Sequence, residues 1–175
     1  YSHNGEVAGE TPEFTGALTR DAGEAVGTYP ITVGTLALAD NAPFRTGNYA
    51  LSFTAGVTFE ITAKDADTFT IAPSGPFTYD GTAHTPEPEV KDGEIVLTKD
   101  TDYTLSYADN TDAGTATLTV TGIGNYTGTQ DATFTIEQRP LTVTPDAGQT
   151  KIFGAADPAF VYGHSGAVAG ETPAF

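Results

Sequence analysis

The chain carries almost the same fourteen residues at its two ends. Residues 1–14 read YSHNGEVAGETPEF and residues 162–175 read YGHSGAVAGETPAF, with ten of the fourteen positions identical. Chance does not produce agreement at that level, and the second copy begins 161 residues after the first. Repetition at a fixed period is the signature of a repeat array. We therefore expect a piece of a longer protein that repeats every 161 residues, seen here as one period plus an overlap.

Apolar and polar residues alternate in several short segments between the two copies. A period of two predicts strands that bury one face only, because successive side chains of a strand point to opposite sides. In residues 57–62 the alternation predicts a core face made of Val57, Phe59 and Ile61. The other segments with this alternation are residues 69–71, 103–107, 116–121, 134–136 and 141–144.

Turn-forming residues separate these segments. PSGP at 73–76, YDG at 79–81, KDG at 91–93 and DNTDAG at 109–114 are rich in Gly, Pro, Asn and Asp, which turns favour. No convincing helical stripe interrupts them. Many short strands without helices predict an all-β fold of tandem antiparallel β-sandwich modules.

Module boundaries are predicted where a strand pattern ends and a turn-rich stretch begins. One such point follows residue 62 and another follows residue 139. Residues 63–139 then form one self-contained module. Residues 1–62 and 140–175 are interpreted as the C-terminal and N-terminal parts of a second module type, which is split between the two chain ends.

Composition excludes several functions. The chain has no Cys, so disulfides, zinc–thiolate sites, iron–sulfur clusters and cysteine nucleophiles are ruled out. Its 23 acidic and 7 basic residues argue against nucleic acid as a partner, because a phosphate backbone requires a basic face. No apolar stretch approaches the roughly 18 residues that span a bilayer, so we expect no membrane insertion.

A catalytic site is not predicted. Ser165 follows His164, but a nucleophile elbow needs Gly-x-Ser-x-Gly on a strand-to-helix turn, and the first copy has Asn4 at the position of this serine. The three histidines, His3, His84 and His164, lack the close spacing of a zinc site. We therefore expect no enzyme activity and no catalytic residues.

Acidic turns leave calcium open as a minor alternative. Asp109, Asn110 and Asp112, the pair Asp65 and Asp67, and the pair Asp100 and Asp102 offer the oxygen ligands that calcium prefers. No segment has the EF-hand pattern, and Asx residues are expected in turns for their own hydrogen bonds. The favoured interpretation is a solvated acidic surface without a cofactor. Lys64 or Lys99 with Asn125 would also suit an isopeptide bond, if a carboxylic acid were buried beside them.

The outer pieces contain a set of characteristic motifs: LTVT at 141–144, KIFG at 151–154, ADPAF at 156–160, VAGE at 168–171, GALTR at 16–20, VGTY at 26–29 and TFEI at 58–61. Through these motifs the outer pieces resemble MBG domains, which are glycine-rich β modules of large bacterial surface proteins. The loop at residues 39–46 is longer than expected for the family.

The middle piece is similar to a bacterial immunoglobulin-like repeat. This resemblance is carried by TYDGT at 78–82, DYTLSY at 102–107, GTAT at 114–117 and GIGNYTG at 122–128. Together the two resemblances imply an extracellular location on a bacterial cell surface, in a stalk or adhesin array. They name no ligand and no catalytic residue.

The split module predicts how copies are joined. Residues 140–175 of one copy are expected to complete the sheet of residues 1–62 of the next, head to tail, by β-strand addition or as neighbours along one continuous chain. The predicted function is a structural repeat of a surface protein or filament, with any glycan or protein ligand at a distant tip. The alternative is a module that itself binds a glycan or a host protein. The strand-donor residues, expected to be buried by the neighbour, are Leu141, Val143, Ile152, Phe153 and Phe160.

Overall fold

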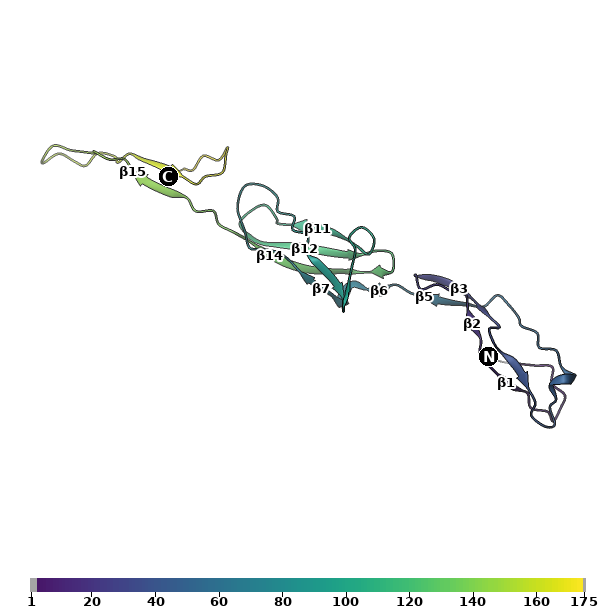
Figure 1. Ribbon diagram of the computed structural model, residues 1–175. Helices are drawn as coiled ribbons and strands as arrows, with labels where there is room; N and C mark the ends of the chain where they lie inside the picture. The colour runs from purple at the N-terminus through teal and green to yellow at the C-terminus, as the bar shows by residue number, and fades with distance from the viewer. Residues whose placement is uncertain (1–2, 175) are drawn as a thin grey trace. The chain divides into compact units, whose positions relative to one another are not determined.

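The computed structural model describes residues 3–174 and confirms the all-β prediction (Figure 1). Strands make up 40% of the chain and helices 3%. The chain divides into two compact units, Tyr1–Lys64 and Asp65–Phe175. Among the described residues, no helix has the length and apolar character needed to cross a membrane.

The first unit contains two small antiparallel sheets. β1 pairs with β4, with Phe14 opposite Leu38. In the other sheet, β3 lies between β2 and β5, with Tyr29 opposite Phe59. The elements are β1 (Glu13–Thr15), β2 (Thr19–Arg20), β3 (Gly27–Thr32), β4 (Ala37–Ala39), the 3-10 helix η1 (Thr46–Asn48) and β5 (Thr58–Ile61).

Very little of the first unit is buried. Among its described residues the only fully buried hydrophobic side chain is Phe44, whose ring stacks on Tyr49 at a centroid distance of 4.7 Å. The predicted strand at residues 57–62 is present as β5, but the predicted burial of Val57 and Phe59 is wrong, since they are 62% and 47% exposed. β5 is the edge strand of a three-stranded sheet, and the described part of this unit places no second sheet over these side chains.

The second unit begins with a two-sheet β-sandwich. One sheet has the order β10-β9-β7 and the other β11-β12-β14-β8. The strands pair antiparallel, except that β8 runs parallel to β14, with Phe77 opposite Ile136. The elements are β6 (Lys64–Asp65), the 3-10 helix η2 (Ala66–Thr68), β7 (Phe69–Ala72), β8 (Phe77–Thr78), β9 (Glu89–Asp92), β10 (Ile95–Val96), β11 (Tyr103–Ala108), β12 (Gly114–Gly122), β13 (Tyr126–Thr127) and β14 (Thr129–Glu137).

The core of the sandwich follows from the alternation in β12. Ala116, Leu118 and Val120 have no exposed surface, whereas the threonines between them lie on the opposite face. Leu118 packs in one cluster with Phe134 and Ile136, and Val120 packs in a second cluster. Full burial of a side chain of this size is worth about 1.5–3 kcal/mol. The predicted strands of the middle piece, and their inward faces, are therefore confirmed.

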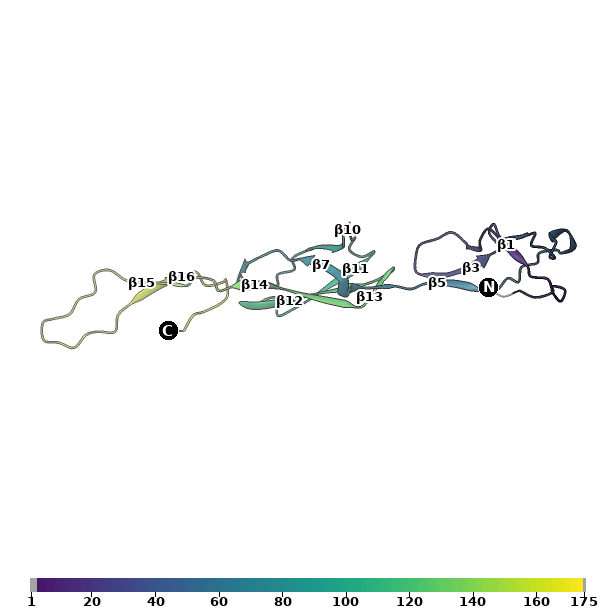
Figure 2. The same cartoon turned by 90° about the horizontal axis from the view of Figure 1, so that it is seen from below.

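The second unit ends with a separate hairpin. β15 (Thr142–Pro145) pairs antiparallel with β16 (Tyr162–Ser165), and Val143 lies opposite His164. Figure 2 shows these two strands side by side, with a long loop between them. Every residue of both strands is exposed. The hairpin therefore has strand pairing but no core of its own.

Candidate interaction surfaces

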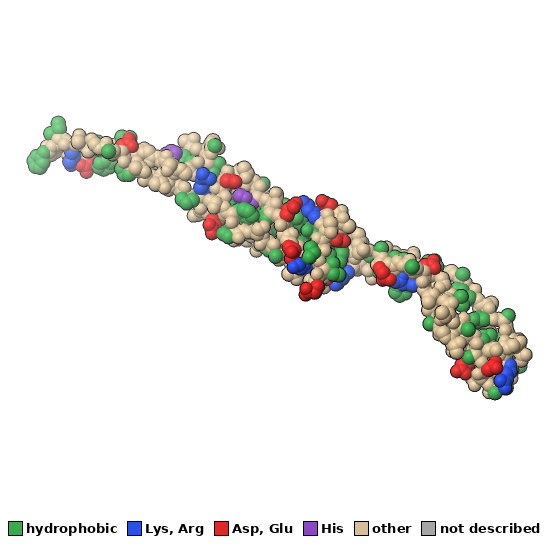
Figure 3. Space-filling view, viewed as in Figure 1, with side chains coloured by type: hydrophobic (Ala, Val, Ile, Leu, Met, Phe, Trp, Pro, Cys, Tyr) green, Lys and Arg blue, Asp and Glu red, His purple; other side chains and the backbone are tan. Residues whose placement is uncertain are grey.

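The hairpin carries the predicted strand donors, and all five side chains are exposed. Leu141 and Val143 are each 43% exposed, while Ile152, Phe153 and Phe160 lie in the loop and are 83%, 102% and 66% exposed. In Figure 3 hydrophobic side chains are visible at the loop end of the hairpin. These five large apolar side chains lie on one short segment, and burying them against another surface would be favourable. That a neighbouring copy buries them stays a prediction.

Polar contacts hold the hairpin loop in shape without a core. The side-chain amide of Gln149 donates to the backbone carbonyls of Asp146 (3.0 Å) and Val161 (2.9 Å). Its carbonyl oxygen accepts from the Val161 N–H at 2.6 Å. Lys151 also forms an ion pair with Asp157 at 2.5 Å. These contacts present the apolar side chains on an ordered loop.

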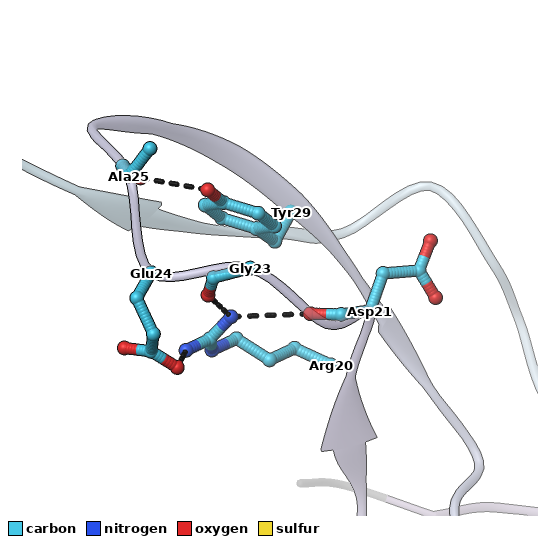
Figure 4. A network of polar contacts seen from close by, with 6 residues as sticks. All are labelled: Arg20, Asp21, Gly23, Glu24, Ala25 and Tyr29. Carbon is cyan, nitrogen blue, oxygen red and sulfur yellow. Dashed lines mark hydrogen bonds and ion pairs between the residues drawn. The ribbon is translucent and has the colours of Figure 1, made fainter.

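In the first unit, Arg20 organises the turn between β2 and β3 (Figure 4). Its guanidinium donates to the carbonyls of Asp21 and Gly23 and to the carboxylate of Glu24, the last at 2.7 Å. The same group lies 4.9 Å from the centroid of the Tyr29 ring and 5.4 Å from that of Phe59. This cation–π contact places the guanidinium over part of the Phe59 ring, which is 47% exposed. Arg20 thus substitutes in part for the second layer that this sheet lacks.

The first copy of the repeated segment forms a tight turn. The N–H of Glu10 donates to the carbonyl of Val7 at 3.0 Å, and Gly9 has φ 93°, a left-handed conformation that glycine adopts without strain. Tyr49 fixes this turn, because its hydroxyl donates to the Glu10 carboxylate and accepts from the N–H of Val7 at 3.2 Å. The hydrogen bond to Glu10 raises the pKa of the Tyr49 phenol above its ordinary value. The turn therefore lies against Tyr49, in the same unit.

The second copy forms the same turn and contacts a different tyrosine. The N–H of Glu171 donates to the carbonyl of Val168 at 3.0 Å, and Gly170 has φ 91°. Here the Glu171 carboxylate accepts from the hydroxyl of Tyr79, which directly follows β8 of the sandwich. This hydrogen bond raises the pKa of Tyr79 as well.

Two further contacts seat the second copy on the end of the sandwich. The Arg139 Nε–H donates to the carbonyl of Gly166 at 2.5 Å. A Cβ at Gly81 would lie only 2.9 Å from Cγ1 of Val168, so the absence of a side chain at Gly81 allows this close approach. Tyr79, Arg139, Gly166 and Val168 line a hollow shared by the sandwich and the segment that follows it.

The residues weighed for catalysis and metal binding mostly have structural roles. Ser165 and His164 lie in β16, opposite Thr142 and Val143, and not on a strand-to-helix turn. His84 stacks on Phe77 at 4.9 Å. In residues 3–174 there is no group of three or more His, Cys, Asp or Glu side chains that could hold a metal ion.

The acidic turns also use their side chains locally. Asn110 donates to the carbonyl of His84 at 2.8 Å, Asp102 accepts from the N–H of Thr98 at 2.8 Å, and Asp65 caps η2 by accepting from the N–H of Asp67. These are the turn-stabilising bonds expected of Asx residues. Lys99, one candidate for an isopeptide bond, forms an ion pair with Glu87, and this contact raises its pKa.

Comparison with known families gives a match within the first unit. Residues 1–60 match the MBG domain (YGX type). The match confirms the resemblance predicted for the front piece, and the similarity of residues 63–139 to an immunoglobulin-like repeat stays a prediction. No curated protein and no solved structure gives a significant match to the chain.

The sequence does not predict the contacts of the repeated turn. The MBG-matching region holds one copy on Tyr49, and the sandwich holds the other on Tyr79. A signal was available, because VAGETP is the longest identical run in the two copies. The residues outside that run differ at four positions, so the identity itself marked the turn.

Proposed function

We propose that the chain is a structural repeat of a long extracellular protein of a bacterial surface, in which MBG modules alternate with immunoglobulin-like sandwiches. The match over residues 1–60 supports the module type. The surface location is supported by the large bacterial surface proteins in which MBG domains are expected. The acidic excess of 16 charges fits a long array, because mutual repulsion keeps such chains soluble and apart. In this role the modules act as spacers that hold a distant tip away from the cell.

One observation carries the proposal: the two copies of the repeated segment make complementary strand pairings. In the second copy, Tyr162–Ser165 form β16 and pair with the preceding β15. In the first copy, His3 and Asn4, which are equivalent to His164 and Ser165, lie in no strand, whereas Glu13 and Phe14 belong to β1 and pair with the following β4. The two pairings use different ends of the fourteen residues.

A single copy of the segment can therefore make both pairings at once. Placed inside a continuous chain, it would join β15 upstream and β4 downstream into one module. This favours covalent continuation over exchange of strands between separate chains, since exchange would leave one copy of the segment displaced. The exposed donors of the hairpin and the uncovered face of β5 would then belong to the same module.

Single-molecule stretching of a chain with several consecutive periods tests this function. Each module should unfold as its own event and lengthen the chain by about 250–300 Å less the length of the folded module, because a module has about 80 residues and an extended residue spans about 3.3–3.6 Å. One concerted event for the whole array would contradict a spacer built of independent modules. Saturable binding of one period on a glycan array would instead support the binding-module alternative.

A further inference from the structure

The two copies of the turn are alike enough to be compared as one element. Both close with the same hydrogen bond, from the glutamate N–H to the valine carbonyl at 3.0 Å, and their central glycines differ in φ by only two degrees. In both, the glutamate carboxylate accepts a tyrosine hydroxyl. The difference is the partner, which is Tyr49 for Glu10 and Tyr79 for Glu171.

The two tyrosines lie on opposite sides of the repeated turn in the sequence, so one turn can contact both. Tyr79 precedes the turn that it contacts, whereas Tyr49 follows the turn that it contacts. In a continuous array each internal turn would have a Tyr79 before it and a Tyr49 after it. A carboxylate has two oxygens and about four acceptor sites, so it can accept both hydroxyls together.

We propose that in the array a single glutamate accepts hydrogen bonds from both tyrosines and so joins each sandwich to the MBG module that follows it. This joint rests on the proposed tandem function and adds to it a specific link between neighbouring modules. Hydrogen bonds to an ionised acceptor are stronger than those between neutral groups.

The backbone around the glutamate is also held from both sides. On the sandwich side, Arg139 donates to the carbonyl of Gly166, and Val168 packs against the bare backbone of Gly81. On the module side, the N–H of Val7, equivalent to Val168, donates to the Tyr49 hydroxyl at 3.2 Å. The valine side chain and the valine N–H serve different partners, so these contacts do not compete.

The test uses residues 1–175 followed directly by residues 15–175 of a second copy, which contains one internal joint, at the Glu171 of the first copy, and an isolated turn at each end of the chain. Each tyrosine phenol is titrated by NMR through its ring Cζ signal. We expect Tyr79 before the joint and Tyr49 after it to titrate above the ordinary tyrosine range of about 10. Glu171→Gln at the joint should lower the pKa of both tyrosines toward that range, because a neutral amide lacks the negative charge with which the carboxylate disfavours the phenolate.

Glu10→Gln in the same chain is the matched control. It should lower the midpoint of the first Tyr49 only, because no sandwich precedes that turn. If Glu171→Gln moves one tyrosine or neither, the shared joint is wrong. The unmodified chain gives a second reading that needs no substitution: the side-chain protons of Glu171 should show nuclear Overhauser contacts to both rings, and contacts to one ring alone would overturn the proposal. Serial unfolding under force would persist in that case, so the joint can fail without the spacer function failing.

Discussion

The sandwich and the first unit use similar strands, yet only the sandwich has a substantial core. Of the eleven buried hydrophobic residues in the described part of the chain, ten lie between Ala66 and Ile136, and Phe44 alone lies in the first unit. Apolar residues alternate with threonine or glutamate in both β12 and β5. In β12 a second sheet covers the apolar face, whereas in β5 the Phe59 ring stays 47% exposed, with the Arg20 guanidinium 5.4 Å from its centroid. Alternation therefore decides which way a side chain points, and burial depends on a second layer.

The largest effect expected from this difference is at Leu118. Leu118→Ala removes a side chain with no exposed surface and should lower the free energy of unfolding of the sandwich by about 2–5 kcal/mol. Phe59→Ala removes a larger side chain that is already 47% exposed and should cost less than about 1 kcal/mol in the first unit. Urea unfolding, followed by NMR signals from each unit, measures both. Equal losses of unfolding free energy in the two variants would contradict the difference in burial between the two regions.

The next effect concerns the hairpin and depends on chain length. Phe160→Ala should change stability by less than about 0.5 kcal/mol in the 175-residue chain, where Phe160 is 66% exposed. When residues 15–62 follow residue 175, the same substitution should cost about 1–3 kcal/mol, because the completed module would cover this ring. Ile95→Ala is the control. Ile95 is 62% exposed in β10, and its substitution should have the same effect on stability with and without the added residues.

Two tyrosine hydroxyls sharpen the contrast between the regions. Tyr107 donates to the carbonyl of Pro86 at 2.7 Å in a partly buried site, and Tyr29 donates to the carbonyl of Ala25 at the same distance in an exposed one. Tyr107→Phe leaves a sheltered acceptor without its donor and should cost about 1 kcal/mol. Tyr29→Phe should cost less, because water can replace the lost donor. Thermal unfolding of the two variants would show this ranking, and a larger loss for Tyr29→Phe would reverse it.

Alkaline pH should lower the stability of the sandwich. Burial raises the pKa of Tyr103, so the folded sandwich keeps the phenol proton at a pH where the unfolded chain has lost it. This contribution is fully present below the unfolded pKa of about 10 and is lost as pH rises through the folded pKa. Denaturation midpoints measured from pH 8 to 11 should fall at the upper end. Tyr103→Phe should flatten that decline, and an unchanged slope would exclude Tyr103 as its source.

The smallest effect is expected at the ion pair of Arg20 with Glu24. The Glu24 side chain is 89% exposed, and solvent-exposed pairs contribute about 0–1 kcal/mol. Glu24→Gln should therefore change the stability of the first unit by no more than about 0.5 kcal/mol, and less at high salt. A loss comparable to that of Leu118→Ala would show that this turn, and not a second layer, holds the unit together.

The sequence was sufficient to predict the strands, because their alternation is local information. The segments at 103–107 and 116–121 became β11 and β12, and the threonines of β12 lie on its outer face as expected. The exposure of Val57 and Phe59 was not predictable in the same way, since it depends on whether another part of the chain packs above β5. Alternation within one strand carries no information about that packing.

The pairing of strands that are distant in sequence was likewise not predictable from the sequence. Nothing in the residues of β8 indicates that Phe77 lies opposite Ile136 in a parallel pair, because register arises from packing over the whole sheet. The tyrosine contacts of the repeated turn belong to the same class. The sequence marked VAGE as repeated, but only the structure shows that Tyr49 and Tyr79 reach its glutamate.

The parallel pairing of β8 with β14 has a mechanical consequence. β8 lies near the beginning of the sandwich and β14 is its last strand, and the two run in the same direction with Phe77 opposite Ile136 and Thr78 opposite Glu137. Tension that draws the start of β8 and the end of β14 apart slides one strand along the other. The hydrogen bonds between them, together with that from the Tyr79 N–H to the Glu137 carbonyl at 2.9 Å, are then sheared simultaneously and not unzipped one after another. The strand order thus places these bonds where they resist pulling as a group.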